Sequence, residues 1–225
     1  MNHFKKMAYP YVAWISVMVV APMLLIVMYA FIEQGNDVTT FKFTLSNFTR
    51  FFSDSVYTDV LYRSLYVALI TTLICLLIGY PAAYIIAMAK PKHKAALVLL
   101  ITFPTWINML VRTYAWLGIL QDNGIINSFL GLFGIEPVQM IYTNFAVILG
   151  MVYNFVPFMI LQIYSALDKM DKSYLEAASD LGANRVQSFL RVTFPMSLPG
   201  VISGITLVFL PAVSSFFIPK LLGGG

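Results

Sequence analysis

The sequence predicts an all-α membrane protein, a polytopic bundle of helices that cross the lipid bilayer. Hydrophobic residues make up 60% of the chain and charged residues 11%, a composition outside the range of soluble globular proteins. Between the charged clusters lie apolar stretches of the roughly 20 residues that a helix needs to cross the hydrocarbon core. These stretches are continuously apolar and do not alternate with polar residues, which excludes a transmembrane β-barrel.

Residues 1–225 are expected to form a single transmembrane domain with five spans. The approximate bounds of the spans are residues 8–31, 64–89, 95–120, 144–167 and 198–219. The first apolar run follows Lys5 and Lys6 and is too long for the hydrophobic region of a cleaved signal peptide. We therefore expect this run to stay in the protein as a membrane anchor.

The orientation follows from the basic residues, because cytoplasmic loops are enriched in lysine and arginine. These residues collect at the N-terminus, between spans two and three, and in the segment 168–197: Lys5, Lys6, Lys90, Lys92, Lys94, Lys169, Lys172, Arg185 and Arg191. We predict that these three segments, and so the N-terminus, are cytoplasmic. The segments 33–63 and 121–143 hold more acids than bases and are expected outside the membrane.

Two features of the outer side follow from this topology. Residues 124–135 carry apolar side chains at helical spacing, which predicts a short amphipathic helix lying at the outer interface. Five spans place the C-terminus outside, where the glycines at 223–225 look like the start of a loop. We therefore expect the natural chain to continue, with a sixth span that is absent here.

Motifs that would carry catalysis are missing from the sequence. The histidines, His3 and His93, both flank spans, and there is no H-E-x-x-H or G-x-S-x-G pattern. The phosphate-binding G-x-x-x-x-G-K-[ST] loop is also missing. We predict a chain that is not an enzyme and has no catalytic residue, metal or cofactor of its own, with any ATP and its Mg²⁺ bound by a partner ATPase.

An autonomous channel or a secondary carrier is the alternative class of transporter. Ion-coupled carriers place an ionisable side chain near the bilayer midplane and are built from internal repeats. Here every Asp and Glu falls in a connecting segment, and no inverted repeat is found. Arg112 is expected near the outer end of span three, where it either extends to the interface as a snorkelling side chain or lines a path or outer gate.

The segment 168–197 contains the most specific pattern. Ser173 and Glu176 fit a capping box at a helix start, and Gly182 fits the left-handed position that ends such a helix. A second short helix is expected from Asn184 to about Arg191, before prolines mark the return to the membrane. The pattern predicts a helix-turn-helix that docks a partner protein through Ser173, Glu176, Ala177, Ala178, Ser179, Asp180, Gly182 and Arg185.

This segment resembles the cytoplasmic docking loop of binding-protein-dependent ABC importer permeases. The family pattern is matched by Glu176-Ala177-Ala178, Gly182, Val192, Phe194 and Pro195, with Phe194 in place of the usual leucine. The resemblance implies the type I ABC importer permease fold with six spans, and a loop that sits in a cleft of the ATPase. Glu176 either contacts the ATPase itself or caps its own helix, and the pattern is compatible with both.

A narrower resemblance comes from residues 104–114, from Leu210-Pro211-Ala212 and from Leu222-Gly223-Gly224. These segments are similar to the spermidine/putrescine importer permeases, the first of the two paired transmembrane subunits. The resemblance implies a bacterial inner membrane location and a heterodimer with a second permease. It further implies two ATPase subunits and an extracellular binding protein that delivers the solute. Another small solute stays open as the alternative substrate.

Polyamines are flexible polycations, which aromatic faces bind through cation–π contacts. Aromatic and polar side chains that could line a substrate path or gate are Trp106, Asn108, Arg112, Tyr114, Tyr153 and Asn154. The competing interpretation is that these aromatic residues pack between helices or anchor the interface. Arg112 is also an unfavourable neighbour for a cation. No carboxylate is expected near the bilayer midplane, which favours selection of the solute by the binding protein.

Overall fold

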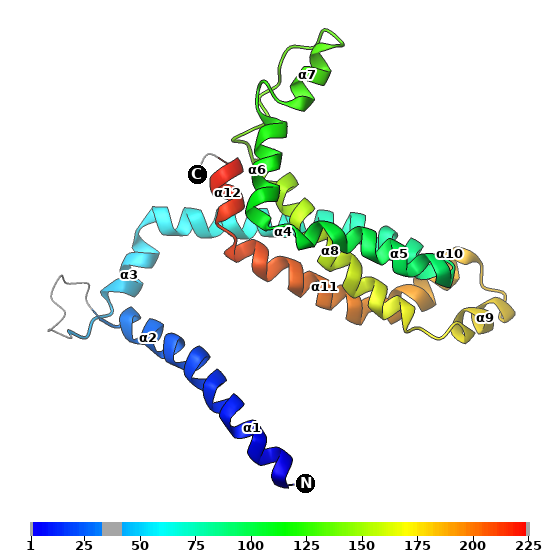
Figure 1. Ribbon diagram of the computed structural model, residues 1–225, viewed down its shortest axis with the longest axis horizontal. Coiled ribbons are helices and arrows are strands. Elements are labelled where there is room, and N and C mark those ends of the chain that lie inside the picture. Colours follow the sequence, from blue (N-terminus) through cyan, green and yellow to red (C-terminus); the bar gives the residue numbers. More distant parts are fainter. Residues whose placement is uncertain (1, 33–41, 224–225) are drawn as a thin grey trace. The chain divides into compact units, whose positions relative to one another are not determined.

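The computed structural model describes residues 2–32 and 42–223, and these form helices joined by short connections (Figure 1). Within the described ranges no strand is present, and the extended backbone is limited to one antiparallel bridge between Ile32 and Phe43. The all-α fold class is confirmed. The chain divides into two compact units, residues 1–62 and 63–225, and each is described by itself.

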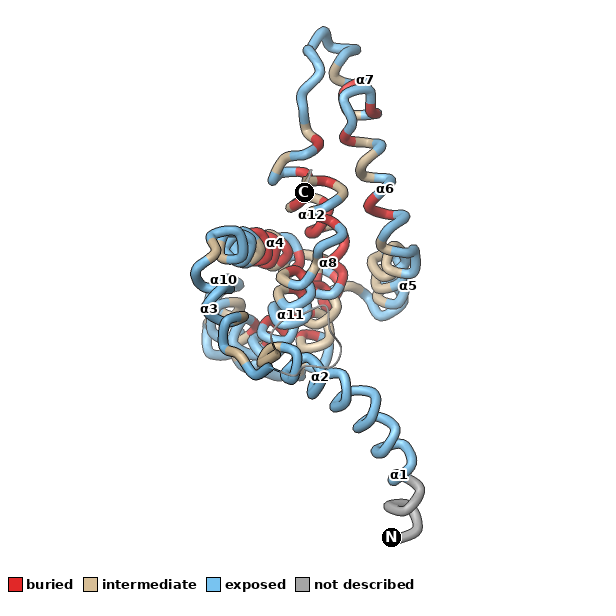
Figure 2. The backbone as a smooth tube through the Cα atoms, turned by 90° about the vertical axis from the view of Figure 1, so that its left-hand side faces the viewer, coloured by how far each residue is buried: buried red, intermediate tan, exposed pale blue. Residues whose placement is uncertain are grey.

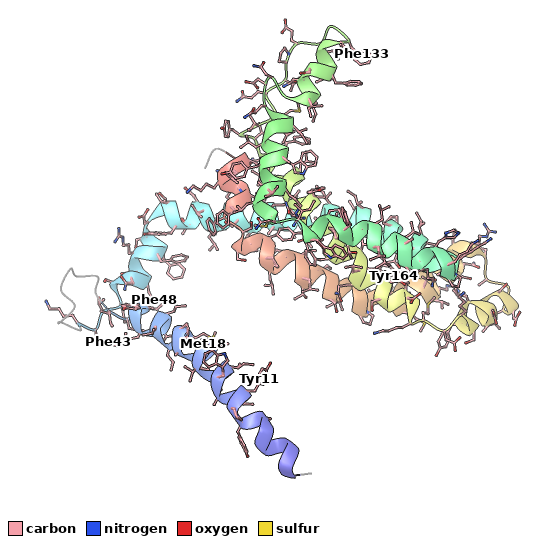
Figure 3. All side chains as sticks on the ribbon, in the orientation of Figure 1. Tyr11, Met18, Phe43, Phe48, Phe133 and Tyr164 are labelled. Atoms are coloured by element: carbon pink, nitrogen blue, oxygen red, sulfur yellow. The ribbon has the colours of Figure 1, made fainter. Side chains whose placement is uncertain are left out.

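The first unit holds the N-terminal apolar helix and a short amphipathic helix. Its elements are α1 (Asn2–Ile15), η1 (Ser16–Val20), α2 (Ala21–Ala30), α3 (Ser46–Ser53) and the first residues of α4 (Ser55–Met88). The side-chain amide of Asn47 donates to the carbonyls of Ala30 at 3.2 Å and Ile32 at 2.9 Å, which satisfies orphan groups at the end of α2. Phe43 and Phe48 lie at the same end (Figure 3), with their rings 5.2 and 5.3 Å from that of Phe31.

The second unit is a helix bundle with short helices at both of its ends. Its elements after α4 are α5 (Pro91–Thr102), η2 (Phe103–Trp106), α6 (Met109–Leu120), α7 (Ile125–Gly131), α8 (Asn144–Asp168), α9 (Ser173–Asp180), α10 (Arg185–Ser188), η3 (Phe189–Thr193), α11 (Phe194–Ser214) and α12 (Phe217–Leu222). The long helices α4, α5, α8 and α11 run side by side (Figures 1 and 2). α9 and α10 lie at one end of this bundle and α12 at the other, and α7 lies at the far tip of α6, away from the bundle.

The centre of the bundle is α8, which packs along its length against α11. Glycines allow the close approach. A Cβ atom at Gly200 would lie 2.6 Å from Ala166 Cβ, and one at Gly204 would lie 2.6 Å from Met159 Sδ. This four-residue spacing of small residues is the usual way in which membrane helices meet, because lipid supplies no hydrophobic force between them. Buried residues accordingly concentrate on α4, α8 and their neighbours (Figure 2).

The third predicted span is broken. The sequence predicts one crossing over residues 95–120, but the helices Pro91–Trp106 and Met109–Gly131 are bent by 87° relative to each other. Asn108 causes a new helix to begin here, because its side-chain oxygen accepts from the N–H of Leu110 at 2.8 Å. α6 therefore leaves the direction of the bundle, and Figure 1 shows it beside α12.

The region around span five also differs from the bounds that the sequence predicts. Residues 185–214 form one continuous helix of 30 residues, so Pro195 does not separate a loop helix from a membrane helix. The π segment η3 ends just before this proline, and η1 likewise ends just before Pro22. Proline lacks the N–H that the preceding turn would use, and in both places the wider π turn lies where the helix hydrogen bonds change register. Residues 217–222 form the separate helix α12, although the sequence predicts that span five continues to residue 219.

Candidate functional site

The candidate docking helix is α9, and Asp171 fixes its first turn. The Asp171 carboxylate accepts from the backbone N–H of Ser173 at 2.9 Å, and hydrogen bonds from Ser173 lower its pKa. No side-chain cap bond links Ser173 and Glu176. The predicted capping box is therefore wrong, because Asp171 already satisfies the N–H that begins the helix. The exposed carboxylate of Glu176 makes no hydrogen bond within the described part of the chain.

The end of α9 agrees with the sequence. Gly182 has a φ of +78°, which confirms the predicted left-handed conformation. Its N–H donates to the carbonyl of Ser179 at 2.9 Å, and the N–H of Ala183 donates to that of Ala178 at 3.0 Å. These two bonds are the Schellman motif, which closes a helix with a glycine. A Cβ atom at Gly182 would meet nothing within 4 Å, so backbone conformation and not crowding demands glycine here.

The capping box of this loop lies at α10. The N–H of Gln187 donates to the Asn184 side chain, and the N–H of Asn184 donates to the Gln187 side chain, both at 2.9 Å. The signal in the sequence is an Asn followed three residues later by Gln, a variant of the capping box pattern. Hydrogen bonds at the N-termini of α9 and α10 and the Schellman motif at Gly182 therefore give the loop a defined conformation, although few of its side chains are buried.

The docking loop exposes a surface that mixes polar and apolar side chains. Ala178 is half-buried, and the other predicted docking residues are exposed: Ser173, Glu176, Ala177, Ser179, Asp180, Gly182 and Arg185. The sequence-based prediction missed Leu181, which is 88% exposed, together with the exposed Tyr174 and Val186. Three exposed apolar side chains therefore lie on a loop that the sequence places outside the membrane spans.

An aromatic cluster joins this loop to the bundle. The ring of Phe189 in η3 lies 5.8 Å from that of Tyr80 and 5.6 Å from that of Tyr84, both edge-on, and both tyrosines belong to α4. The ring of Phe194 lies 5.9 Å from that of Tyr80. On the other side of the loop, Lys94 of α5 forms an ion pair with Asp168 at the end of α8. These contacts could not be predicted from the sequence, since the residues involved are far apart along the chain.

The predicted path residues fall into two groups. Trp106 and Tyr114 are exposed, and Asn108 caps α6. Arg112, by contrast, is 9% exposed, and its guanidinium carbon lies 6.0 Å from the centre of the Tyr153 ring. Burial within the fold does not fit a snorkelling side chain, which keeps its charged end in water.

Tyr153 is held between two side chains of α6. Its ring meets that of Trp116 edge-on at 5.5 Å, with Arg112 one helical turn away on the same face of α6. Asn154 is buried, and its amide donates to the carbonyl of Gly150 at 2.7 Å, within α8. Arg112, Trp116 and Tyr153 thus form one cluster. Among residues 2–32 and 42–223 no group of three metal-ligating side chains lies close together.

Comparison with known proteins gives consistent similarities over nearly the whole chain. The family described as "Binding-protein-dependent transport system inner membrane component" matches residues 2–225. The chain is 41% identical to the spermidine/putrescine transport system permease protein PotB of Haemophilus influenzae, over 99% of this chain and 79% of that protein. Identity to PotB of Escherichia coli is also 41%, over 95% of this chain and 78% of that protein.

Similarity to a solved structure supports the same fold. A bacterial ABC transporter involved in the import of the acidic polysaccharide alginate contains a chain that superposes with a TM-score of 0.68. The match covers 94% of this chain and 73% of that chain, at 18% sequence identity. At this identity the likeness concerns the arrangement of the helices and not the solute.

Proposed function

Because this chain belongs to the family of binding-protein-dependent transport system inner membrane components, we propose that it is a permease subunit of an importer for polyamines such as spermidine and putrescine. The observation that carries the proposal is the 41% identity over 99% of the chain to a permease named for these solutes. The chain is integral to the membrane, and the proposed location is the bacterial inner membrane with a cytoplasmic N-terminus.

The proposed partner at α9 and α10 is an ATPase subunit, which binds ATP and Mg²⁺ for the whole complex. Support comes from the exposed Leu181, Tyr174 and Val186 and from the carboxylate of Glu176 on the same loop, which has no ion-pair partner among the described residues. An apolar patch with a charged group beside it suits a protein cleft better than water. The aromatic contacts of Phe189 then connect the docked loop to α4.

The proposed path for the solute lies between this chain and a second permease subunit, with an extracellular binding protein delivering the polyamine. The cluster of Arg112, Trp116 and Tyr153 is the proposed outer gate. Among the described residues no acidic side chain pairs with this cluster, so this chain is expected to offer a weak and transient path. Selection of the solute is then the task of the binding protein.

Uptake by whole cells tests this proposal. The native gene is expressed with its partner genes in cells that lack polyamine import, and uptake of labelled spermidine and putrescine is measured. A matched control carries an ATPase subunit whose phosphate-binding lysine is replaced. Energy-dependent uptake with the intact system and none with the control supports the proposal. Uptake of another solute without any polyamine uptake contradicts the polyamine assignment and favours a permease for that solute.

A further inference from the structure

Arg112 carries a buried positive charge that this chain does not neutralise within its described residues. Its Nε and Nη1 atoms are enclosed by the protein and have no hydrogen-bond acceptor among residues 2–32 and 42–223. The ring of Tyr153, 6.0 Å away, offers a weak electrostatic contact to the charge but no acceptor. A guanidinium has five N–H groups and stays charged in proteins, so an enclosed one calls for an anion beside it.

The depth of Arg112 separates it from the lipid headgroups. Tyr153, over which it lies, is about 22 Å along α8 from Asp168, at 1.5 Å per residue. The helix from Pro91 to Trp106, just before the bend, extends about 22 Å from the same side by the same rise. In a hydrocarbon core of about 30 Å, both values place the cluster below the outer headgroups. An acceptor at this depth is expected from protein.

The acidic residues of the chain do not supply this acceptor where they are described. The one ion pair among the described residues joins Lys94 and Asp168, at the other end of α8. The acids on the outer side of the second unit, Asp122 and Glu136, form no ion pair or side-chain hydrogen bond with Arg112. Val111 and Tyr114, close to Arg112 in the sequence of α6, are exposed apolar side chains.

We propose that Arg112 binds an Asp or Glu carboxylate of the second permease subunit, and that this pair fastens the two subunits together at the outer side of the path. The inference rests on the proposed function, because that function supplies the second subunit. A carboxylate complements the charge and geometry of a guanidinium with two parallel hydrogen bonds.

The pair keeps the permeating cation away from a bare positive charge. Once a carboxylate neutralises the guanidinium, the repulsion that a polyamine meets at this level falls. Separation of the two subunits at the outer side would expose both charges, so the ion pair favours a closed outer face. Arg112 is therefore a positioning residue between subunits and not a ligand of the solute.

The test is a charge-reversal screen in the complete complex of both permease subunits and the ATPase. Each Asp and Glu of the second permease subunit is replaced singly by Lys and combined with Arg112→Glu in this chain. Two quantities are measured: the amount of this chain in the membrane, and the fraction that is recovered with a tag on the second subunit. Arg63→Glu is the matched control, since Arg63 is an exposed arginine whose one side-chain hydrogen bond within the described residues is to Asn144, at 3.4 Å.

Arg112→Glu alone is expected to lower recovery with the second subunit at least tenfold, while Arg63→Glu changes it less than twofold. One replacement in the second subunit is expected to restore recovery to within threefold of the unaltered complex. The same replacement must restore the amount of this chain if Arg112→Glu lowers that amount, so a folding defect does not hide the pairing.

Three results overturn the inference. In the first, no replacement in the second subunit restores recovery. In the second, recovery is restored by reversing Glu33 or Asp37 of this chain, which places the counter-charge within one subunit. In the third, recovery with Arg112→Gln is normal, which shows that the charge is not needed. Recovery of the unaltered complex in lipid discs that depends on anionic lipid also contradicts the inference, because it assigns the guanidinium to a headgroup. If the unaltered chain itself is not recovered with a second permease subunit, the proposed function fails as well.

Discussion

The hydroxyl groups of Tyr80 in α4 and Ser197 in α11 lie 2.8 Å apart and share a hydrogen bond. Ser197 donates its single proton to the carbonyl of Phe194, also at 2.8 Å, so Tyr80 must be the donor. The bond lies just after η3, where the docking loop continues into the membrane helix. It ties the first turn of α11 to α4.

Tyr80→Phe is expected to lower the free energy of unfolding by about 1 kcal/mol, the typical net value of one hydrogen bond. The loss is modest because Ser197 keeps its bond to Phe194 and no donor is left unpaired. The midpoint of thermal unfolding of the purified complex in detergent measures the effect. Tyr84→Phe is the matched control, since the Tyr84 hydroxyl makes no hydrogen bond within the described residues while its ring contacts Phe189 in the same way. Equal effects of the two variants would contradict the assignment.

Gly182 is expected to tolerate Asn and to reject Val. The left-handed conformation costs a side chain about 1–2 kcal/mol, and Asn adopts it more readily than a β-branched residue. Because the space around Gly182 is open, the defect should follow backbone preference and not side-chain size. The measurement is co-purification of the ATPase with the permease, because binding of the ATPase is expected to depend on the conformation of the loop. Gly131→Val, at a helical glycine that also has open space around it, should leave co-purification unchanged, and an equal loss there would sink the explanation.

Glu176→Gln separates the charge of this side chain from its shape. Since Glu176 does not cap α9, the amide should leave the helix intact and weaken only the contact with the ATPase. The expected result is an affinity for the ATPase reduced by about tenfold, as for the loss of one charge-assisted bond, at unchanged thermal stability. Asp180→Asn, an exposed acid at the other end of the same helix, is the control. Unchanged affinity in Glu176→Gln would show that Glu176 is not part of the contact.

The start of α9 should depend on pH through Asp171. Hydrogen bonds from Ser173 stabilise the carboxylate and lower its pKa below the ordinary 3.8. A lowered pKa means that the stabilisation is complete above pH 3.8 and is lost as the pH falls through the lower folded value. Amide exchange at Ser173, corrected for intrinsic rates, should therefore accelerate only below about pH 4. Asp171→Asn keeps an acceptor without a titrating group, so it should remove this pH dependence; if the dependence persists, another group is responsible.

The sequence was sufficient for the features that depend on local chemistry. Continuous apolar stretches predict the all-α membrane fold, and Gly182, nine residues after the predicted helix start at Ser173, predicts the left-handed end of α9. The break before Asn108 was missed because the helices on both sides are together apolar enough to predict one span. The bond from the Ser173 N–H to Asp171 was missed because Ser173 and Glu176 themselves fit a capping box in the sequence. Two contacts could be found only from the tertiary arrangement: that of Arg112 with Tyr153 and that of Phe189 with Tyr80. Helices far apart in the sequence bring these side chains together.

The π segment η3 lies where the candidate docking loop continues into the membrane helix, and this junction is the part of residues 185–214 that bends most easily. Pro195 and Pro199 lack N–H groups, so the turns around them have fewer helix hydrogen bonds, and helices bend most readily at such places. A few residues later, Gly200 and Gly204 hold α11 tightly against α8. A pull on α10 should therefore flex the chain between residues 189 and 199 before it moves α11 along α8. The junction therefore acts as a hinge. A docked partner can turn through small angles while the transmembrane helices keep their packing.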